Sequence, residues 1–238
     1  MRRGGRVITR ATIVGAGGLG GPIAFSLGAA GLDLAIVDHD SVELSNLHRQ
    51  IQFTTDDLGR PKATRLADAV VARGGKARGV VERWTPALAD EQLADADVII
   101  DGSDDPATKF AVADWAVANG RPYVIAAALR YGGNAMAGAP GVACYRCLFE
   151  EPQEAPTCAD AGVLGPVVGA IGGLAAALLV GLAQGDRTHA GSLFVFDDLR
   201  KESTPRIVQF APRRGCPACA KAPVSPFEPA PVRVAKGS

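Results

Sequence analysis

Two polar stretches of the chain carry side chains suited to gripping the phosphates of a nucleotide. Residues 45–50 read Ser-Asn-Leu-His-Arg-Gln, and residues 59–62 read Gly-Arg-Pro-Lys. The forked guanidinium of Arg49 can bind two phosphate oxygens, and Lys62 can act as a point charge on a phosphate under attack. Together with Asn46 they favour nucleotidyl transfer over hydride transfer, because a dehydrogenase leaves its cofactor's phosphates unchanged. The alternative is a solvated loop whose charges face water.

A glycine-rich loop precedes both stretches and predicts a nucleotide site. Glycines after a first strand let the backbone approach a phosphate, and the following helix supplies N–H groups and positive potential. Asp38, about twenty residues further on, stands where a carboxylate binds a ribose, and Asp40 is a second candidate. A purely structural turn is the alternative. The loop glycines are Gly15, Gly17, Gly18 and Gly20.

Three acids follow the fourth expected strand, in the stretch Asp-Gly-Ser-Asp-Asp at residues 101–105. Asp105 precedes Pro106 and is therefore expected to cap the next helix. We expect Asp104 to hold a magnesium ion that bridges a triphosphate, since Mg²⁺ is bound by few carboxylates together with substrate phosphates.

Four of the five cysteines form two Cys-x-x-Cys pairs, Cys144 with Cys147 and Cys216 with Cys219. Two such pairs in one chain predict a structural tetrathiolate zinc site. Redox dithiols and buried thiols are the alternatives. A closed tetrahedral site has no open position, so no catalysis is assigned to it.

Cys158 has no such partner and lies in a stretch flanked by proline and glycine. It is either a small apolar filler or a nucleophile on a mobile loop. The residues alone leave both interpretations open.

The elements that must position these residues alternate as in a Rossmann-like α/β fold with a doubly wound, mostly parallel sheet. Helices are expected between the strands, at residues 18–30, 62–73 and 106–119. The expected strands cover residues 9–14, 34–37, 77–83, 97–100 and 123–126.

An antiparallel extension of the sheet is expected after residue 128, with strands at residues 134–139, 192–196 and 206–210. The segment 166–183 has no charged residue and is long enough to raise a transmembrane question. Its glycines and its lack of aromatic or basic anchors favour a buried helix. We expect one domain over residues 1–220, followed by a disordered proline-rich tail over residues 221–238.

The composition points to a cytoplasmic protein that does not bind nucleic acid. The 238 residues include 25 basic and 25 acidic side chains, so no net charge indicates a nucleic-acid partner. The basic N-terminus has no apolar segment after it and does not resemble a signal peptide. Unclustered cysteines favour a reducing compartment.

The motifs occur in an order that resembles the ThiF/MoeB (HesA/MoeB/ThiF) family, adenylyltransferases related to ubiquitin-activating enzymes. The resemblance runs from about residue 6 to residue 220. It rests on the glycine loop, Asp38, the stretches 45–50 and 60–62, Asp-Gly-Ser-Asp at 101–104, both Cys-x-x-Cys pairs and Thr157-Cys158 followed by Ala-Gly-Val at 161–163.

The resemblance implies ATP-dependent adenylation of the C-terminal Gly-Gly carboxylate of a small ubiquitin-like sulfur carrier, in thiamine, molybdopterin or related biosynthesis. It also implies a homodimer, a structural zinc ion and a separate sulfur donor, a cysteine desulfurase or a rhodanese. No membrane partner is expected.

Residue by residue, the resemblance gives Asp38 to the ribose and Asn46, Arg49 and Lys62 to the phosphates. Gln50 belongs to the same motif. Asp104 becomes the magnesium ligand and essential acid, and Cys158 matches a cysteine that handles sulfur in ThiF-like members. The family's Arg-Tyr-x-Arg-Gln motif does not occur in the sequence.

Two other functions stay open at this point. An NAD-dependent oxidoreductase would explain the glycine loop and Asp38 but would leave Arg49 and Lys62 without a role. A non-catalytic module of the same fold would bind the carrier protein without adenylating it.

Overall fold

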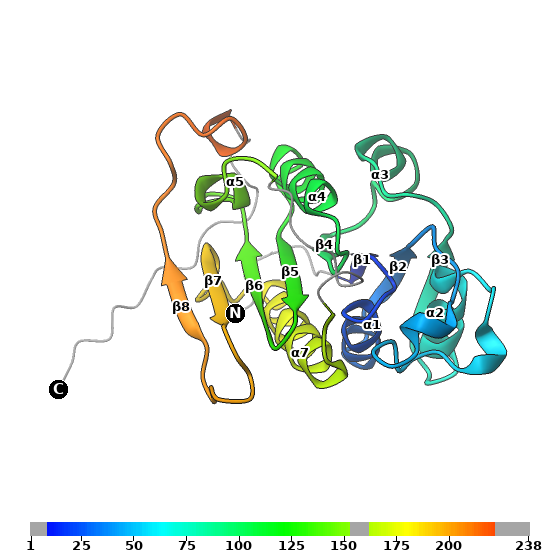
Figure 1. Ribbon diagram of the computed structural model, residues 1–238. Coiled ribbons are helices and arrows are strands. Elements are labelled where there is room, and N and C mark those ends of the chain that lie inside the picture. The colour runs from blue at the N-terminus through cyan, green and yellow to red at the C-terminus, as the bar shows by residue number, and fades with distance from the viewer. Residues whose placement is uncertain (1–8, 153–161, 222–238) are drawn as a thin grey trace.

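A computed structural model of the chain describes residues 9–152 and 162–221. The expected disordered tail, apart from residue 221, lies outside the described residues, as does Cys158. The described part is built on one eight-stranded sheet in the order β3-β2-β1-β4-β5-β6-β7-β8 (Figure 1).

The first five strands are parallel and the last three antiparallel, which confirms the predicted architecture. The parallel strands are β1 (Arg10–Val14), β2 (Asp33–Val37), β3 (Lys76–Val80), β4 (Val98–Asp101) and β5 (Tyr123–Leu129), and the antiparallel strands are β6 (Gly132–Gly138), β7 (Ser192–Phe196) and β8 (Arg206–Gln209).

Helices cover both faces of the sheet, so its central strands are buried and apolar on both sides. One face packs against α1 (Gly20–Ala29), α2 (Lys62–Val71) and α7 (Gly165–Ala183). The other packs against α3 (Pro86–Gln92), α4 (Pro106–Ala118) and α5 (Tyr145–Leu148).

The third strand is shorter than expected: β3 ends at Val80, so Glu82 and Arg83 lie in the loop after it. The helix α3 was not expected from the sequence. Its start has a recognisable signal, because Thr85 caps it by accepting a hydrogen bond from the backbone N–H of Leu88, and Pro86 occupies the first turn.

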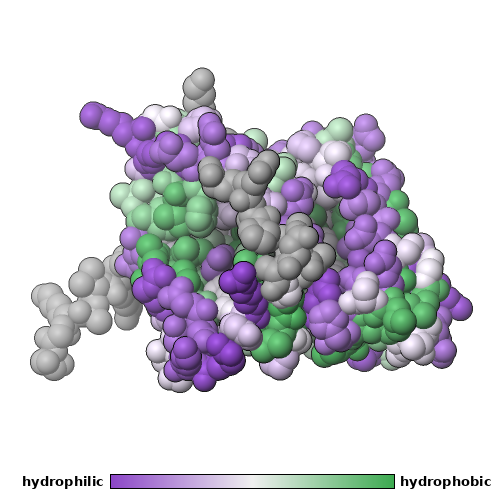
Figure 2. Space-filling view, viewed as in Figure 1, coloured by the Kyte–Doolittle hydropathy of each residue, from purple (hydrophilic) through white to green (hydrophobic). Residues whose placement is uncertain are grey.

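The uncharged helix α7 packs one face against α1, β5 and β6, as expected for a buried helix. Its length and composition would also suit a membrane span, although half of its most apolar 18-residue stretch is buried in the protein. Its exposed and half-buried positions are mostly glycine and alanine, with Leu174 and Val180 among them. The face of the molecule seen in Figure 2 has hydrophobic surface near the place where α7 lies in Figure 1.

Candidate functional site

A cavity of about 890 Å³ lies at the carboxyl ends of the central parallel strands. Loops at these ends of a doubly wound sheet form the ligand crevice. The cavity is within the usual size of ligand pockets and combines apolar walls with charged groups. It brings together Gly15, Gly17, Gly18, Asp38, Asn46, Arg49, Gln50, Lys62 and Asp104 from the predicted set.

The glycine loop turns sharply between β1 and α1 and leaves no room for a side chain at Gly15 or Gly20. Gly15 has φ +91°, and a Cβ there would lie 2.9 Å from the backbone nitrogen of Ser103. A Cβ on Gly20 would lie 2.1 Å from the carbonyl oxygen of Gly15. The loop therefore needs glycine at both positions for its own packing, and close approach of a phosphate to this backbone stays a prediction.

Asp38 ties the glycine loop to the end of β2. One carboxylate oxygen accepts a 2.7 Å hydrogen bond from the backbone N–H of Ala16, and the other accepts one of 2.8 Å from that of Asp40. Burial raises the pKa of Asp38, and these two hydrogen bonds oppose that rise. Asp38 thus shapes the loop and also lines the cavity, where the sequence predicts a ribose.

Gln52 supports the same loop from behind and was missed by the sequence analysis. Its side-chain amide donates hydrogen bonds of 2.9 Å to the carbonyl oxygens of Ala16 and Gly17. A Cβ on Gly21 would lie 2.4 Å from the Gln52 amide oxygen. The contact could not be read from the sequence, because Gln52 is 35 positions away from Gly17.

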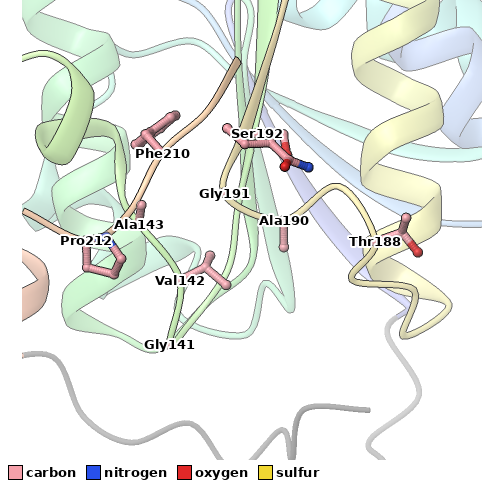
Figure 3. A pocket seen from close by; sticks show the side chains of 10 residues that line it. Gly141, Val142, Ala143, Thr188, Ala190, Gly191, Ser192, Phe210 and Pro212 are labelled. Carbon is pink, nitrogen blue, oxygen red and sulfur yellow. The ribbon is translucent and has the colours of Figure 1, made fainter. Parts of the chain in front are cut away.

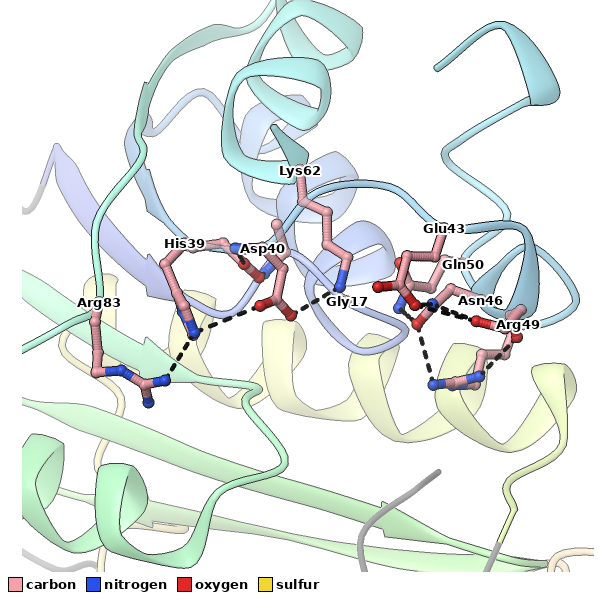
Figure 4. A network of polar contacts seen from close by, with 12 residues as sticks. Gly17, His39, Asp40, Glu43, Asn46, Arg49, Gln50, Lys62 and Arg83 are labelled. Carbon is pink, nitrogen blue, oxygen red and sulfur yellow. Dashed lines mark hydrogen bonds and ion pairs between the residues drawn. The ribbon is translucent and has the colours of Figure 1, made fainter. Parts of the chain in front are cut away.

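Asn46 organises the side chains around it (Figure 4). Its side-chain oxygen Oδ1 accepts hydrogen bonds from the side chains of Gln50 at 2.9 Å and Arg49 at 3.3 Å. Its side-chain nitrogen Nδ2 donates to the side chains of Glu43 and Ser45. Asn46 and Gln50 are buried, whereas Arg49 is partly exposed. The amide of Asn46 therefore holds the guanidinium of Arg49 against the cavity.

Lys62 begins α2 and carries a buried ammonium group on the cavity wall. Its Nζ lies 2.9 Å from a carboxylate oxygen of Asp40, and its side chain is only 7% exposed. Burial opposes ionisation of Asp40, but the hydrogen bond and charge of Lys62 lower the pKa of that carboxyl below its ordinary value. Asp40 is the only side-chain partner of Nζ within residues 9–152 and 162–221. An ammonium has three donors, so two remain for a ligand.

The acids after β4 have three different environments. Asp105 caps α4, as predicted, by accepting hydrogen bonds from the backbone N–H groups of Ala107 and Thr108. Asp104 is exposed, lines the cavity and has no ion-pair partner in the described part of the chain. Asp101 is fully buried and belongs to a separate ion pair.

That ion pair joins Asp101 to Lys109, a cavity-lining residue that sequence reasoning missed. The Lys109 ammonium donates to Asp101 Oδ2 at 2.8 Å and to the carbonyl oxygens of Ser103 and Ala126 at 2.6 and 2.7 Å. All three donors are used, so Lys109 links the end of β4 to the middle of β5 and has none left for a phosphate.

The two Cys-x-x-Cys pairs meet although 72 positions separate Cys144 from Cys216. The Sγ atom of Cys144 lies 3.7 Å from Sγ of Cys147 and 3.6 Å from Sγ of Cys216. The Sγ atoms of Cys147 and Cys219 lie 3.4 Å apart. Four thiolates around a tetrahedral zinc ion with bonds of about 2.3 Å would lie about 3.8 Å from one another. The donor set and its geometry therefore fit a zinc ion.

The thiols of this cluster differ in how easily they ionise. Burial raises the pKa of Cys219 to about 11. Burial acts in the same direction on Cys216, but the backbone N–H groups of Cys219 and Ala218 outweigh it and lower the pKa of Cys216 to about 7. The cluster thus contains a thiol that readily becomes a thiolate, the form that binds metal.

A second, smaller cavity of about 320 Å³ lies between the loop before α5, the start of β7 and the end of β8 (Figure 3). Its lining consists of small, apolar or uncharged residues such as Val142, Ser192 and Phe210. Among the described residues, its lining includes no titratable side chain.

The fold and the large cavity define a doubly wound α/β protein with a ligand site at the carboxyl ends of its parallel strands and four clustered cysteines suited to a metal ion. The chain belongs to the ThiF family, whose model matches residues 8–218.

Curated relatives agree with this membership. The chain is 38% identical over 213 residues to the sulfur carrier protein ThiS adenylyltransferase of Escherichia coli K12, covering 87% of this chain and 84% of that protein. It is 37% identical over 230 residues to a sulfur carrier protein adenylyltransferase of Thermus thermophilus, covering 89% and 82%. The adenylyltransferase and sulfurtransferase MOCS3 of Caenorhabditis briggsae is 37% identical, and the chain spans only 57% of its length.

Solved structures show the same fold. Escherichia coli MccB with ATP superimposes with a TM-score of 0.75, covering 90% of this chain and 67% of that one. The sequence identity is 19%, so this likeness concerns the fold alone.

Proposed function

We propose that the chain uses ATP to adenylate the C-terminal Gly-Gly carboxylate of a small ubiquitin-like sulfur carrier. The buried Lys62 ammonium carries the proposal, because two of its donors are left for a ligand on the wall of a nucleotide cavity. A dinucleotide that keeps its phosphates has no need of such a group. The names of the Escherichia coli and Thermus thermophilus relatives support the same activity.

In the proposed reaction, a carboxylate oxygen of the carrier attacks the α-phosphorus of ATP. The bond from that phosphorus to the bridging oxygen breaks, pyrophosphate leaves and an acyl adenylate forms. No general base is required, since the attacking group is already ionised. Catalysis would come from alignment and charge neutralisation.

Each cavity residue has a place in this proposal. Asp38 would accept hydrogen bonds from the ribose, and Arg49, held by Asn46 and near Gln50, would bind phosphate oxygens. Lys62 would neutralise charge on the phosphates. The exposed carboxylate of Asp104 would hold magnesium, which supplies further charge neutralisation when bound.

The four cysteines would bind zinc with a structural role. The cluster links the start of α5 to the end of the described chain at residues 219–221. All four ligands come from the protein, which leaves no position for a substrate. The zinc ion would therefore fix the C-terminal segment against the sheet.

The remaining parts of the proposal concern partners. A separate protein, a cysteine desulfurase or a rhodanese, would deliver sulfur to the activated carrier, and Cys158 is the candidate residue for handling it. A Cys158→Ser variant should still adenylate the carrier but lose sulfur transfer in a reconstituted system. Full transfer would make Cys158 an apolar filler.

A homodimer is supported by the outward face of α7. Within the described residues, a Cβ built on Gly169, Gly173 or Gly181 meets no packing neighbour within 4 Å, and Ala177 is exposed on the same helix. This four-residue spacing of small side chains would let a second copy's backbone approach closely. The helix has no charge to desolvate on that face.

The direct test is mass spectrometry of candidate carrier proteins after incubation with ATP, magnesium and the enzyme. We expect one carrier to gain an adenylyl group from the wild-type enzyme. The Lys62→Ala variant should not transfer this group. A carrier that binds but never gains the group would contradict the proposal and leave a binding module. Nicotinamide binding without carrier-dependent ATP–pyrophosphate exchange would point to an oxidoreductase.

A further inference from the structure

We propose that Asp40, with the positive charge of Arg83 nearby, is a positioning residue that holds the Lys62 ammonium where the nucleotide phosphates bind. This inference rests on the proposed function and assigns a role to two cavity residues, Asp40 and Arg83, that the phosphate motifs do not include. Asp40 was considered above only as a second candidate for the ribose.

Asp40 joins the end of β2 to the start of α2 through both its side chain and its backbone. Its Oδ2 lies 2.9 Å from Lys62 Nζ, and its carbonyl oxygen accepts a 2.9 Å hydrogen bond from the Lys62 backbone N–H. Its own backbone N–H donates to Asp38 Oδ1 at 2.8 Å. One residue therefore fixes Lys62 relative to the carboxylate expected to bind the ribose.

Behind Asp40, two further side chains continue the line along the cavity wall (Figure 4). His39 Nε2 lies 3.4 Å from Asp40 Oδ1, and Arg83 donates a 2.8 Å hydrogen bond to the same Nε2. Only a neutral imidazole with its proton on Nδ1 can accept at Nε2. The arginine therefore selects that tautomer, in which Nε2 has no proton to donate to Asp40. The support for the Asp40 carboxylate comes from the positive charge of the Arg83 guanidinium, which His39 holds in place.

This arrangement suits a lysine that must contact phosphate and must not turn out of the cavity into solvent. A free lysine side chain loses rotamer entropy when it is fixed, and burying its charge has a desolvation cost. Asp40 counters both effects, because its charge stabilises the ammonium and its oxygen fixes one of the three N–H donors. The other two stay available for the nucleotide.

Contact with Asp40 should therefore matter more for turnover than for ATP binding. An Asp40→Asn variant removes the charge but keeps the shape, which lets Lys62 leave its place. We expect kcat for carrier adenylation to fall about 10- to 100-fold, as for a reacting group displaced by about 1 Å. KM for ATP should change less than about 3-fold, since Asp40 also repels the phosphates it helps to place.

A double-mutant cycle separates positioning from a general structural role. If Asp40 acts through Lys62, Asp40→Asn should have no further effect on kcat in a Lys62→Ala background. If the two substitutions instead lowered kcat by the product of their separate factors, the proposal would be contradicted.

Arg83→Ala should give a smaller loss of kcat than Asp40→Asn, because Arg83 acts on Asp40 from one residue further away. Asp68→Asn is the matched control on α2, an exposed acid paired with Arg65, and should leave kcat within about 2-fold.

A measurement independent of turnover uses acetic anhydride labelling of Lys62, followed by mass spectrometry. We expect faster labelling of Lys62 in Asp40→Asn than in the wild type or in Asp68→Asn, because the side chain is less well held and reaches solvent more often. Equal labelling rates in a folded variant would overturn the inference. Failure of the wild type to adenylate any carrier would instead overturn the proposed function, and the labelling result would still stand by itself.

Discussion

Asp104 and Asp105 are neighbours in the sequence, yet they face different partners. The carboxylate of Asp105 is used by the first turn of α4 and by the hydroxyl of Thr108. The carboxylate of Asp104 is exposed on the cavity wall. Alanine substitutions at these two positions should therefore separate stability from chemistry.

We expect Asp105→Ala to destabilise the fold by about 1 kcal/mol, the usual cost of losing a helix cap, which lowers Tm by roughly 2–4 °C at this size. Asp104→Ala should leave Tm unchanged but abolish carrier-dependent ATP–pyrophosphate exchange. Intact exchange with Asp104→Ala would remove Asp104 from the metal site. Calorimetry and exchange assays on the same preparations give both results.

The contribution of Asp105 should also depend on pH in a defined direction. Burial opposes ionisation, but hydrogen bonds from Thr108 and Ala107 lower the pKa of Asp105 below its ordinary value of 3.8. A lowered folded-state pKa gives stability that is present above the unfolded pKa and is lost as the pH falls through the folded one. The difference in Tm between wild type and Asp105→Ala should be full at neutral pH and shrink below about pH 4. A difference that stays constant down to pH 2 would show that the cap does not depend on charge.

At this scale the sequence predicts residues in local motifs and misses those placed by tertiary contact. The cap at Asp105 and the glycines of the phosphate loop have signals within a few residues. Lys109 and Arg83 have none, because their partners Asp101 and His39 lie on other elements. A lysine inside a helix pattern gives no sign that it will be buried.

At the scale of elements, α7 shows how one helix can carry two unlike faces. Gly172 packs on α1, where a Cβ would lie 3.0 Å from Pro22 Cβ and 3.1 Å from the Leu19 carbonyl oxygen. Gly173 faces outward, and a Cβ there meets nothing within 4 Å. An apolar run without charges predicts burial, but the sequence alone does not say which side is covered.

Alanine substitutions at these adjacent glycines should have opposite effects on the isolated chain. Gly172→Ala should destabilise it by about 1–3 kcal/mol, since the new methyl group overpacks the contact with α1. Gly173→Ala should stabilise it by about 0.5–1 kcal/mol, because alanine favours helix more than glycine does. Urea unfolding at low protein concentration measures both. Equal effects would mean that the two faces are not distinguished in this way.

The cysteine cluster ties two distant segments and should be tested as an element. Its pairs were predictable because each has the short spacing of a zinc ligand pair, whereas their meeting across the fold had to be inferred. We expect metal analysis to find about one zinc ion per chain. Cys219→Ser should lose the metal and expose the segment after β8 to proteolysis, with a control substitution at the nearby exposed Arg214 leaving both unchanged. Retention of zinc would contradict the assignment.

At the scale of the whole molecule, the order of elements was predictable from alternating strand and helix patterns, and the chain belongs to a family with this fold. The antiparallel strands β6, β7 and β8 extend the sheet beyond the nucleotide cavity. They place α7 across β5 and β6 with its small-residue face outward. The relation between two copies is a property that no strand or helix pattern contains.

The outward face of α7 gives the final prediction, on oligomeric state. If two copies pack through Gly169, Gly173 and Ala177, a Gly173→Glu variant would bury an unpaired charge in a close helix contact, and the dimer should dissociate. Light scattering after gel filtration should then change from twice the chain mass of 24.4 kDa to that mass. Ala87→Glu, on the exposed side of α3, is the control and should remain dimeric. A dimer that tolerates glutamate at residue 173 would place the interface elsewhere, whereas a monomeric wild type would exclude the homodimer itself.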